Sequence, residues 1–140
     1  MAIPVAGSRG DGGRDDRADP FFKRAREIAD GGQFDFAIEM FIQGLEIAPH
    51  RVDAHRELRN VSLERKVNGG QAMGLFATMK LKRQTKNHKH NMLMAEKLLS
   101  YDPGNTDHML SLLQNAAKAG LLDVVDWIEP ILRKAADESY

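Results

Sequence analysis

The sequence contains no cysteine among its 140 residues. Disulfide bonds, thiolate metal sites and cysteine nucleophiles are therefore excluded. It also lacks any apolar run approaching the roughly 20 residues that span a bilayer. The N-terminal segment mixes glycine with charges of both signs and has no apolar centre of the kind found in signal peptides. From these absences we expect a soluble, cytoplasmic protein.

The chain also lacks a net charge, because 20 Lys and Arg residues balance 20 Asp and Glu residues. A balanced charge gives no global reason to expect a nucleic acid or an acidic substrate. The balance is uneven along the chain, however. From Arg65 to Lys89 there are seven basic residues and no acidic one. This local asymmetry needs an explanation of its own.

Apolar residues recur at intervals of three and four along most of the chain, which is the period of a helix. No segment alternates strictly as a strand does, so the sequence predicts an all-α fold. Residues 1–19 hold four of the twelve glycines and few large apolar side chains, and we expect them to be disordered. Asp19 followed by Pro20 predicts the start of the first helix. The predicted helices cover residues 20–30, 35–48, 52–66, 71–83, 86–101, 106–119 and 122–136.

One stretch carries the pattern of a helical repeat. The segment GQFDFAIEMFIQGLEIAP, together with the helix before it, resembles a tetratricopeptide (TPR) repeat, a helix-turn-helix unit of about 34 residues. Small residues are needed where the two helices of a pair approach closely, and large aromatic residues fill the space beside them. The residues that match this pattern within 18–51 are Phe21, Ala25, Gly32, Phe34, Ala37, Phe41, Gly44 and Pro49.

The resemblance continues with two less regular copies, which we assign to residues 52–105 and 106–136. The second copy is interrupted by an insertion at about 67–86. A closer similarity, carried by the stretches AEKLL, DPGNT and LLQNAAKAGL, is to uncharacterised bacterial repeat proteins of the planctomycete type, and it implies no activity. We therefore expect residues 20–140 to form one TPR-like helical domain.

The resemblance implies a right-handed superhelix of about three helix pairs, with an inserted helix in the second pair. TPR arrays mostly bind peptides or partner helices in a concave groove lined by the first helix of each pair. This implies a non-catalytic scaffold for protein–protein interaction that needs no cofactor. By register, the groove positions are Phe22, Arg26, Ala29, Arg56, Asn60, Leu63, Leu110, Gln114 and Ala117. Phe22 and Leu110 fit the core between helices equally well.

Other kinds of chemistry find little support in the residues. His88 and His90 are two apart, which points them to different sides of a helix, and the other histidines lie near separate turns. We therefore expect no metal site. The serines lack a nearby His/Asp context and no phosphate-binding glycine loop occurs, so we do not expect an enzyme. Both GGQ tripeptides, which begin at Gly31 and Gly69, fall where a helix must stop.

The basic stretch KLKRQTKNHKH supplies five cations, namely Lys80, Lys82, Arg83, Lys86 and Lys89. The simplest interpretation is a solvated insertion. As an alternative function, the amphipathic insertion over residues 71–90 would make the chain an adaptor for a partner protein, an anionic membrane surface or RNA. RNA is the least favoured of these, because no aromatic side chain lies within the run to stack on a base.

The last predicted helix is apolar along one face, whereas an array normally ends on a polar capping helix. We therefore expect either that the chain is a fragment of a longer protein or that this face pairs with another copy in a homo-oligomer. The apolar residues concerned are Val124, Val125, Trp127, Ile128, Ile131 and Leu132.

Overall fold

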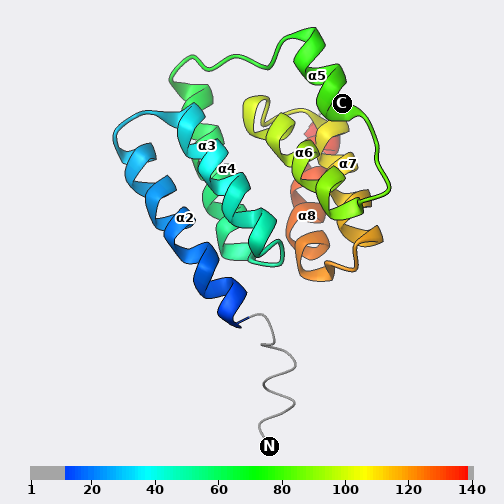
Figure 1. Cartoon of the computed structure of the whole chain (residues 1–140). Coiled ribbons are helices and arrows are strands. Elements are labelled where there is room, and N and C mark those ends of the chain that lie inside the picture. The colour runs from blue at the N-terminus through cyan, green and yellow to red at the C-terminus, as the bar shows by residue number, and fades with distance from the viewer. Residues whose placement is uncertain (1–11, 139–140) are drawn as a thin grey trace, which may run out of the picture.

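The chain is helical throughout most of the part that the structure describes, residues 12–138 of a computed structural model (Figure 1). No strand occurs within residues 12–138, so the predicted all-α fold is confirmed. The helices are α2 (Gly12–Asp30), α3 (Phe34–Ile47), α4 (Val52–Val67), α5 (Leu75–Lys82), α6 (His88–Tyr101), α7 (Thr106–Lys118) and α8 (Leu122–Glu138).

The first helix begins earlier than its sequence pattern suggests. The predicted disorder through residue 19 and the predicted start at Pro20 are wrong for the described residues, because α2 begins at Gly12 and holds Pro20 in its interior. Ala18 gives the reason: its side chain is fully buried and extends the apolar stripe of Phe22 and Ala25 by one turn. Residues 1–11, also predicted to be disordered, lie outside the described residues.

α2 and α3 form a tightly packed pair around small side chains. Ala25 and Ala37 are both fully buried, and the rings of Phe22 and Phe41 stack with their centroids 6.2 Å apart. Gly44 lies against the Phe22 ring, and a Cβ atom at this position would come within 3.0 Å of three ring carbons. The helices can therefore approach only because this position has no side chain.

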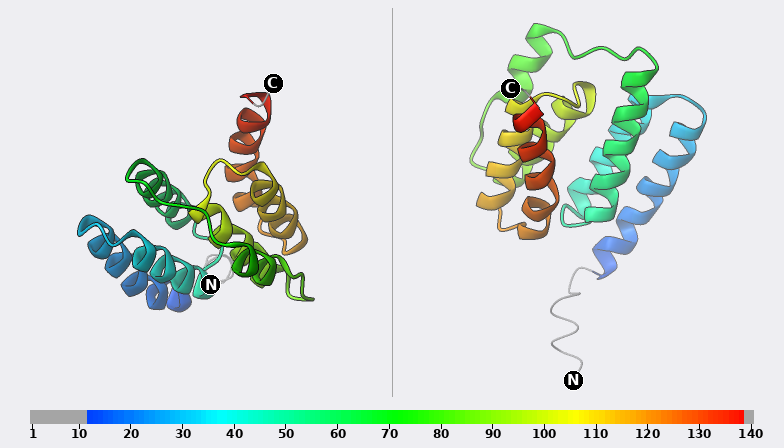
Figure 2. Two further views of the ribbon diagram at one scale, coloured as in Figure 1. Left: turned by 90° about the horizontal axis from the view of Figure 1, so that it is seen from above. Right: turned by 180° about the vertical axis from the view of Figure 1, so that it is seen from behind.

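Two groups of helices make up the molecule. α2, α3 and α4 lie side by side in one group, and α6, α7 and α8 form the other (Figures 1 and 2). α6 packs against both α3 and α4, and α8 also contacts α4. One buried apolar cluster runs through both groups, since it includes Ile38, Leu58, Leu93 and Ile128. The core is thus continuous from α2 to α8.

A polar cluster is buried where α4, α6 and α8 meet. His55 is completely buried, and its Nδ1 lies 2.8 Å from both carboxylate oxygens of Glu96. Its Nε2 lies 2.7 Å from the carbonyl oxygen of Pro49, and the ring of Trp127 covers it with centroids 5.4 Å apart. Because a carbonyl oxygen can only accept, Nε2 donates to Pro49, and the carboxyl group of Glu96 at Nδ1 favours the protonated form of the ring.

The apolar face of α8 is turned into the molecule. Val124 and Ile128 are fully buried, and Trp127 packs against His55. The other predicted members of the face are partly buried against the same core. α8 packs onto α7 and α4, which covers part of this face within the chain, and pairing with a second copy through α8 stays a prediction.

The inserted helix is shorter than predicted and stands apart. α5 begins at Leu75 rather than at residue 71, and none of its residues is buried. Its main contact is with α6, and Figure 2 shows it outside both groups of helices. Gly69, with φ of +91°, ends α4 in the left-handed conformation that favours glycine, as Gly32 ends α2 with φ of +83°. Both GGQ tripeptides therefore lie at turns.

Candidate functional site

A shallow groove lies between α2 and α4 and has a volume of about 240 Å³. Three of the groove positions predicted from the sequence, Arg26, Ala29 and Asn60, lie in its lining. The structure adds residues that the repeat register did not indicate, mostly from the facing side of α4. We define the acidic groove by its lining: Arg26, Ala29, Asp30, Phe41, Glu57, Asn60, Val61 and Glu64.

The acidic groove has an apolar floor and a polar rim. Ala29, Phe41 and Val61 are buried and form the floor, where the small side chain of alanine leaves the space that the groove occupies. The rim consists of side chains that remain partly or largely exposed to solvent: Arg26, Asp30, Glu57, Asn60 and Glu64. This combination provides apolar contact below and hydrogen-bonding groups above.

The rim carries more negative than positive charge. Nη1 of Arg26 donates hydrogen bonds to both carboxylate oxygens of Glu57, at 2.9 and 3.0 Å. Such an exposed pair stabilises the fold by less than about 1 kcal/mol, so its main effect is on the local charge. The one cation of the groove is thereby matched, and Asp30 and Glu64 leave two negative charges without a cation in the lining.

A second ion-paired arginine fixes α4 beside α2. Nη1 of Arg51 donates to Asp19 at 2.8 Å, while its Nε and Nη2 donate to the two oxygens of Asp53 at 3.0 and 2.8 Å. Its guanidinium also lies 5.3 Å from the ring centroid of Phe22. The hydrogen bond to Asp53 raises the pKa of Arg51 in spite of partial burial. No motif identified this residue in the sequence, because its partners on α2 and α4 come together only in the fold.

These contacts show how α2 and α4 run. Arg51 at the start of α4 pairs with Asp19, and Glu57 one to two turns later pairs with Arg26 farther along α2. The two helices therefore point in the same direction. This is the relation expected for the first helices of two successive helix pairs.

The remaining predicted groove positions do not join the acidic groove. Phe22 is only 1% exposed and belongs to the core, so its assignment to the groove is wrong. Arg56 and Leu63 are exposed on α4 but lie outside the groove lining. Leu110 and Gln114 lie on α7, and Gln114 lines a separate hollow. The expected continuous surface is divided because α4 packs against α3, α6 and α8 and makes no comparable contact with α7.

That separate hollow has a volume of about 350 Å³ and lies between α5, α6 and α7. Asn91 closes one end, since its amide oxygen accepts hydrogen bonds from the backbone nitrogen and hydroxyl of Thr85 and its nitrogen donates to the Thr85 carbonyl. Oδ1 of Asn115 has no hydrogen-bond partner among the described residues, but it is itself enclosed. A ligand in the hollow would therefore reach it only if the side chain moved.

The five cations of the insertion surround α5 and do not lie in the acidic groove. Lys80, Lys82, Arg83 and Lys86 are exposed, and Lys89 is half-buried in the first turn of α6. Lys82 also lines the hollow between α5, α6 and α7. The basic insertion and the acidic groove are thus two separate surfaces of opposite charge.

Two further findings apply to residues 12–138. No group of three or more His, Cys, Asp or Glu side chains there is placed to hold a metal ion. No helix in that range has the length and apolar character needed to cross a membrane.

Three comparisons with known proteins bear on what the acidic groove does. No family model, no curated protein and no solved structure matches this chain. The chemistry of the groove is therefore the guide to what it binds.

Proposed function

We propose that this chain is a non-catalytic scaffold built from TPR-like helix pairs, and that it binds a basic peptide or a basic helix of a partner protein in the acidic groove. The observation that carries the proposal is the excess of carboxylates over cations around an apolar floor between α2 and α4. The parallel course of α2 and α4, fixed by Arg51 and Arg26, supports the comparison with stacked helix pairs.

The size of the groove favours a segment of polypeptide over a small molecule. Pockets for drug-sized ligands enclose roughly 300–1,000 Å³ and bury most of the ligand. The acidic groove is smaller, at about 240 Å³, and open along its length. It accommodates a few side chains of a longer ligand whose remaining residues extend over α2 and α4.

The charge of the groove selects basic side chains. The methylene groups of a lysine or arginine can lie against Ala29 and Val61, while the charged end reaches the carboxylates of Asp30 and Glu64. Asn60 offers both a donor and an acceptor to the peptide backbone. Charged groups at such a rim mainly set specificity and the rate of association, so binding should weaken as salt is added.

The experiment measures binding of a fluorescent synthetic peptide with lysine and leucine at helical spacing. The test variant carries Asp30→Asn and Glu64→Gln. Its matched control carries Glu46→Gln and Asp126→Asn, two exposed acids outside the groove. Both variants lose two negative charges, so the overall attraction for a cationic peptide changes equally.

We expect the groove variant to bind the peptide about ten-fold more weakly than the control, which corresponds to about 1.4 kcal/mol. A peptide with glutamate in place of lysine should not bind. Equal affinities of the two variants would contradict the groove assignment, and undiminished binding of the acidic peptide would contradict the proposed charge preference.

A further inference from the structure

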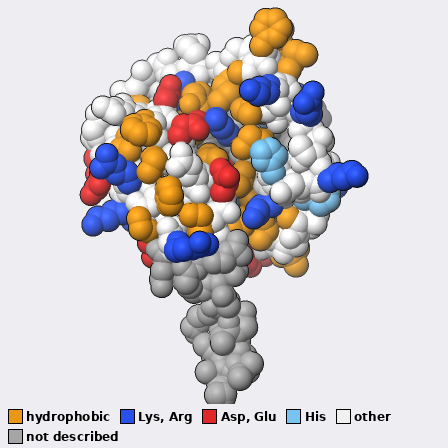
Figure 3. Space-filling view, viewed as in Figure 1, with side chains coloured by type: hydrophobic (Ala, Val, Ile, Leu, Met, Phe, Trp, Pro, Cys, Tyr) orange, Lys and Arg blue, Asp and Glu red, His pale blue; other side chains and the backbone are white. Residues whose placement is uncertain are grey.

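The inserted helix α5 exposes an apolar tip. Leu75 is 71% exposed, Phe76 86% and Met79 60%, and these are among the most exposed large apolar side chains of the described chain. Figure 3 shows hydrophobic side chains gathered at the edge of the molecule where α5 lies, with Lys and Arg side chains close by. Such a cluster on a protruding element is typical of a surface that binds something.

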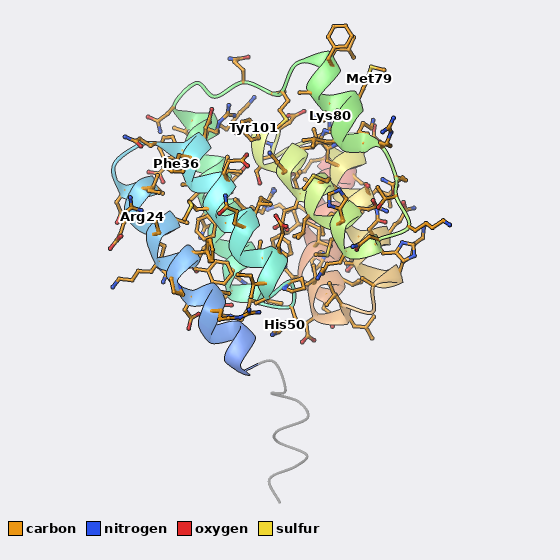
Figure 4. All side chains as sticks on the ribbon, viewed as in Figure 1. Arg24, Phe36, His50, Met79, Lys80 and Tyr101 are labelled. Carbon is orange, nitrogen blue, oxygen red and sulfur yellow. The ribbon has the colours of Figure 1, made fainter. Side chains whose placement is uncertain are left out.

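The two sides of α5 differ in what they contact. The side of α5 that faces α6 carries two half-buried residues, Thr78 and Leu81. The opposite side carries the exposed apolar residues Leu75, Phe76 and Met79, which helical spacing brings together. Figure 4 shows Met79 projecting outward from α5 near Lys80. The inner side therefore attaches the helix to the fold, and the outer side has no partner among the described residues.

Cations flank the apolar tip, and the segment of sequence that carries it contains no acidic residue. Lys80, Lys82, Arg83 and Lys86 are all exposed on or just after α5. The sequence has no Asp or Glu anywhere between Arg65 and Ala95. In a chain with no net charge, this leaves one strongly positive region, and it coincides with the most exposed apolar side chains.

The hydrogen bonds of Asn91 hold this region in place. Its side chain bonds the backbone and hydroxyl of Thr85 in the loop that follows α5. Asn91 is 2% exposed, so its side of these bonds is shielded from water, whereas Thr85 lies at the surface. The loop is thereby fixed against α6, and the apolar tip is held away from the two groups of helices.

We propose that α5 docks the protein on an anionic lipid bilayer, with Leu75, Phe76 and Met79 inserted among the lipid chains and the neighbouring cations on the headgroups. Interfacial helices combine apolar residues that enter the bilayer with Lys and Arg that bind anionic lipids. The apolar tip of α5 protrudes from the molecule, and lipid chains can pack around a protruding side chain from every outer side. RNA is a poorer match, because Phe76 is the one aromatic ring on α5 available to stack on a base.

The experiment measures co-sedimentation with vesicles of phosphatidylcholine, either alone or containing phosphatidylserine. Two variants, each with its own control, are compared. The tip variant carries Phe76→Ser and Met79→Ser, with Phe36→Ser, on an exposed residue of α3, as its control. The charge variant carries Lys80→Gln, Arg83→Gln and Lys86→Gln, with Lys23→Gln, Arg24→Gln and Lys134→Gln as a control that loses the same charge.

The wild-type chain should bind vesicles containing phosphatidylserine and not those of phosphatidylcholine alone. Each cation near an anionic surface strengthens binding about five-fold, so the charge variant should bind on the order of 100-fold more weakly. The affinity of the tip variant for these vesicles should be lower by about ten-fold or more, because an aromatic ring and a methionine side chain no longer enter the bilayer. Both control variants should bind as the wild type does.

Three results would overturn the proposal: no binding to either kind of vesicle, equal binding to both kinds, or equal losses in the tip variant and its control. Binding of tRNA that depends on the charge set but not on the tip set, without vesicle binding, would assign the surface to RNA instead. The Asp30 and Glu64 substitutions leave α5 unchanged, so vesicle binding by that variant separates this proposal from the one for the acidic groove.

Discussion

At the scale of single residues, His55 is a buried side chain held by contacts on both ring nitrogens. It is enclosed by α4, α6 and α8, with oxygen atoms of Glu96 and Pro49 on its two ring nitrogens. Burial by itself would lower the pKa of His55, but Glu96 and the Pro49 carbonyl outweigh it, and the pKa is raised above its ordinary value of 6.5, with Asp53 adding to the effect. No motif indicates this cluster, because His55 and Glu96 meet only in the fold.

The raised pKa makes stability depend on pH. Between 6.5 and the folded-state pKa of His55, the folded protein holds a proton that the unfolded chain has lost. The stabilisation is therefore complete below pH 6.5 and is lost as pH rises through the folded-state pKa. We expect the free energy of unfolding, measured with urea, to fall from pH 6 to pH 9.

Glu96→Gln should remove the main favourable cause and leave burial to lower the pKa of His55. Stability contributed by this site would then rise, not fall, with increasing pH. At pH 6 the variant should lose about 3 kcal/mol, the usual cost of breaking a buried pair. His88→Gln, on an exposed residue at the start of α6, serves as the control. A pH dependence unchanged by Glu96→Gln would show that His55 is not the group responsible.

At the scale of helices, the closest approach is between α2 and α3 at Gly44. Alanine there would gain up to about 1 kcal/mol of helix propensity. The added Cβ, however, would lie within 3.0 Å of three carbons of the Phe22 ring, which is only 1% exposed and has no room to move away. Because overpacking of this kind costs about 1–3 kcal/mol, we expect Gly44→Ala to destabilise the protein by about 1–2 kcal/mol.

Gly104→Ala is the matched control for this prediction, because a Cβ at residue 104 meets no atom within 4 Å and its φ is not in the left-handed region. Its unfolding free energy should stay within about 0.5 kcal/mol of the wild type. Urea denaturation of both variants checks the comparison. A more stable Gly44→Ala protein would mean that the Phe22 ring can shift without cost.

The helices were predictable where local pattern and burial agree. Three helices begin at the predicted residues, α4 at Val52, α7 at Thr106 and α8 at Leu122. At each of these positions turn residues precede the helix and apolar residues follow at helical spacing. The start of α2 was not predictable, since the burial of Ala18 depends on packing against the rest of the fold. α5 is shorter than its apolar pattern indicates, because Ala72 has no apolar surface to pack against.

At the scale of the whole molecule, α4 joins the two groups of helices. Its contacts with α3, α6 and α8 explain why the lining of the acidic groove was only partly predictable. The repeat register correctly placed Arg26 and Asn60 in one groove, because both depend on neighbouring segments of the chain. It also assigned Gln114 to this groove, but Gln114 lines the separate hollow between α5, α6 and α7.

Trp127 reports on the junction between the groups, as it is the single tryptophan and packs on His55. The continuous core predicts that both groups unfold together. We therefore expect urea transitions followed by Trp127 emission and by far-ultraviolet circular dichroism to coincide. Phe36→Trp adds a probe on α3 and should give the same midpoint. An earlier transition in Trp127 emission alone would show that α8 detaches before the rest unfolds.

The contact between α4 and α8 also affects the rate of folding. A linear stack of helix pairs forms mainly contacts between neighbours in sequence, and such chains fold fast because each loop to be closed is short. Here the contact between His55 and Trp127 joins residues roughly half the chain apart, so a long loop has to close before the ring of His55 is covered. Folding should therefore end in a slow docking step, during which this ring is still exposed to water.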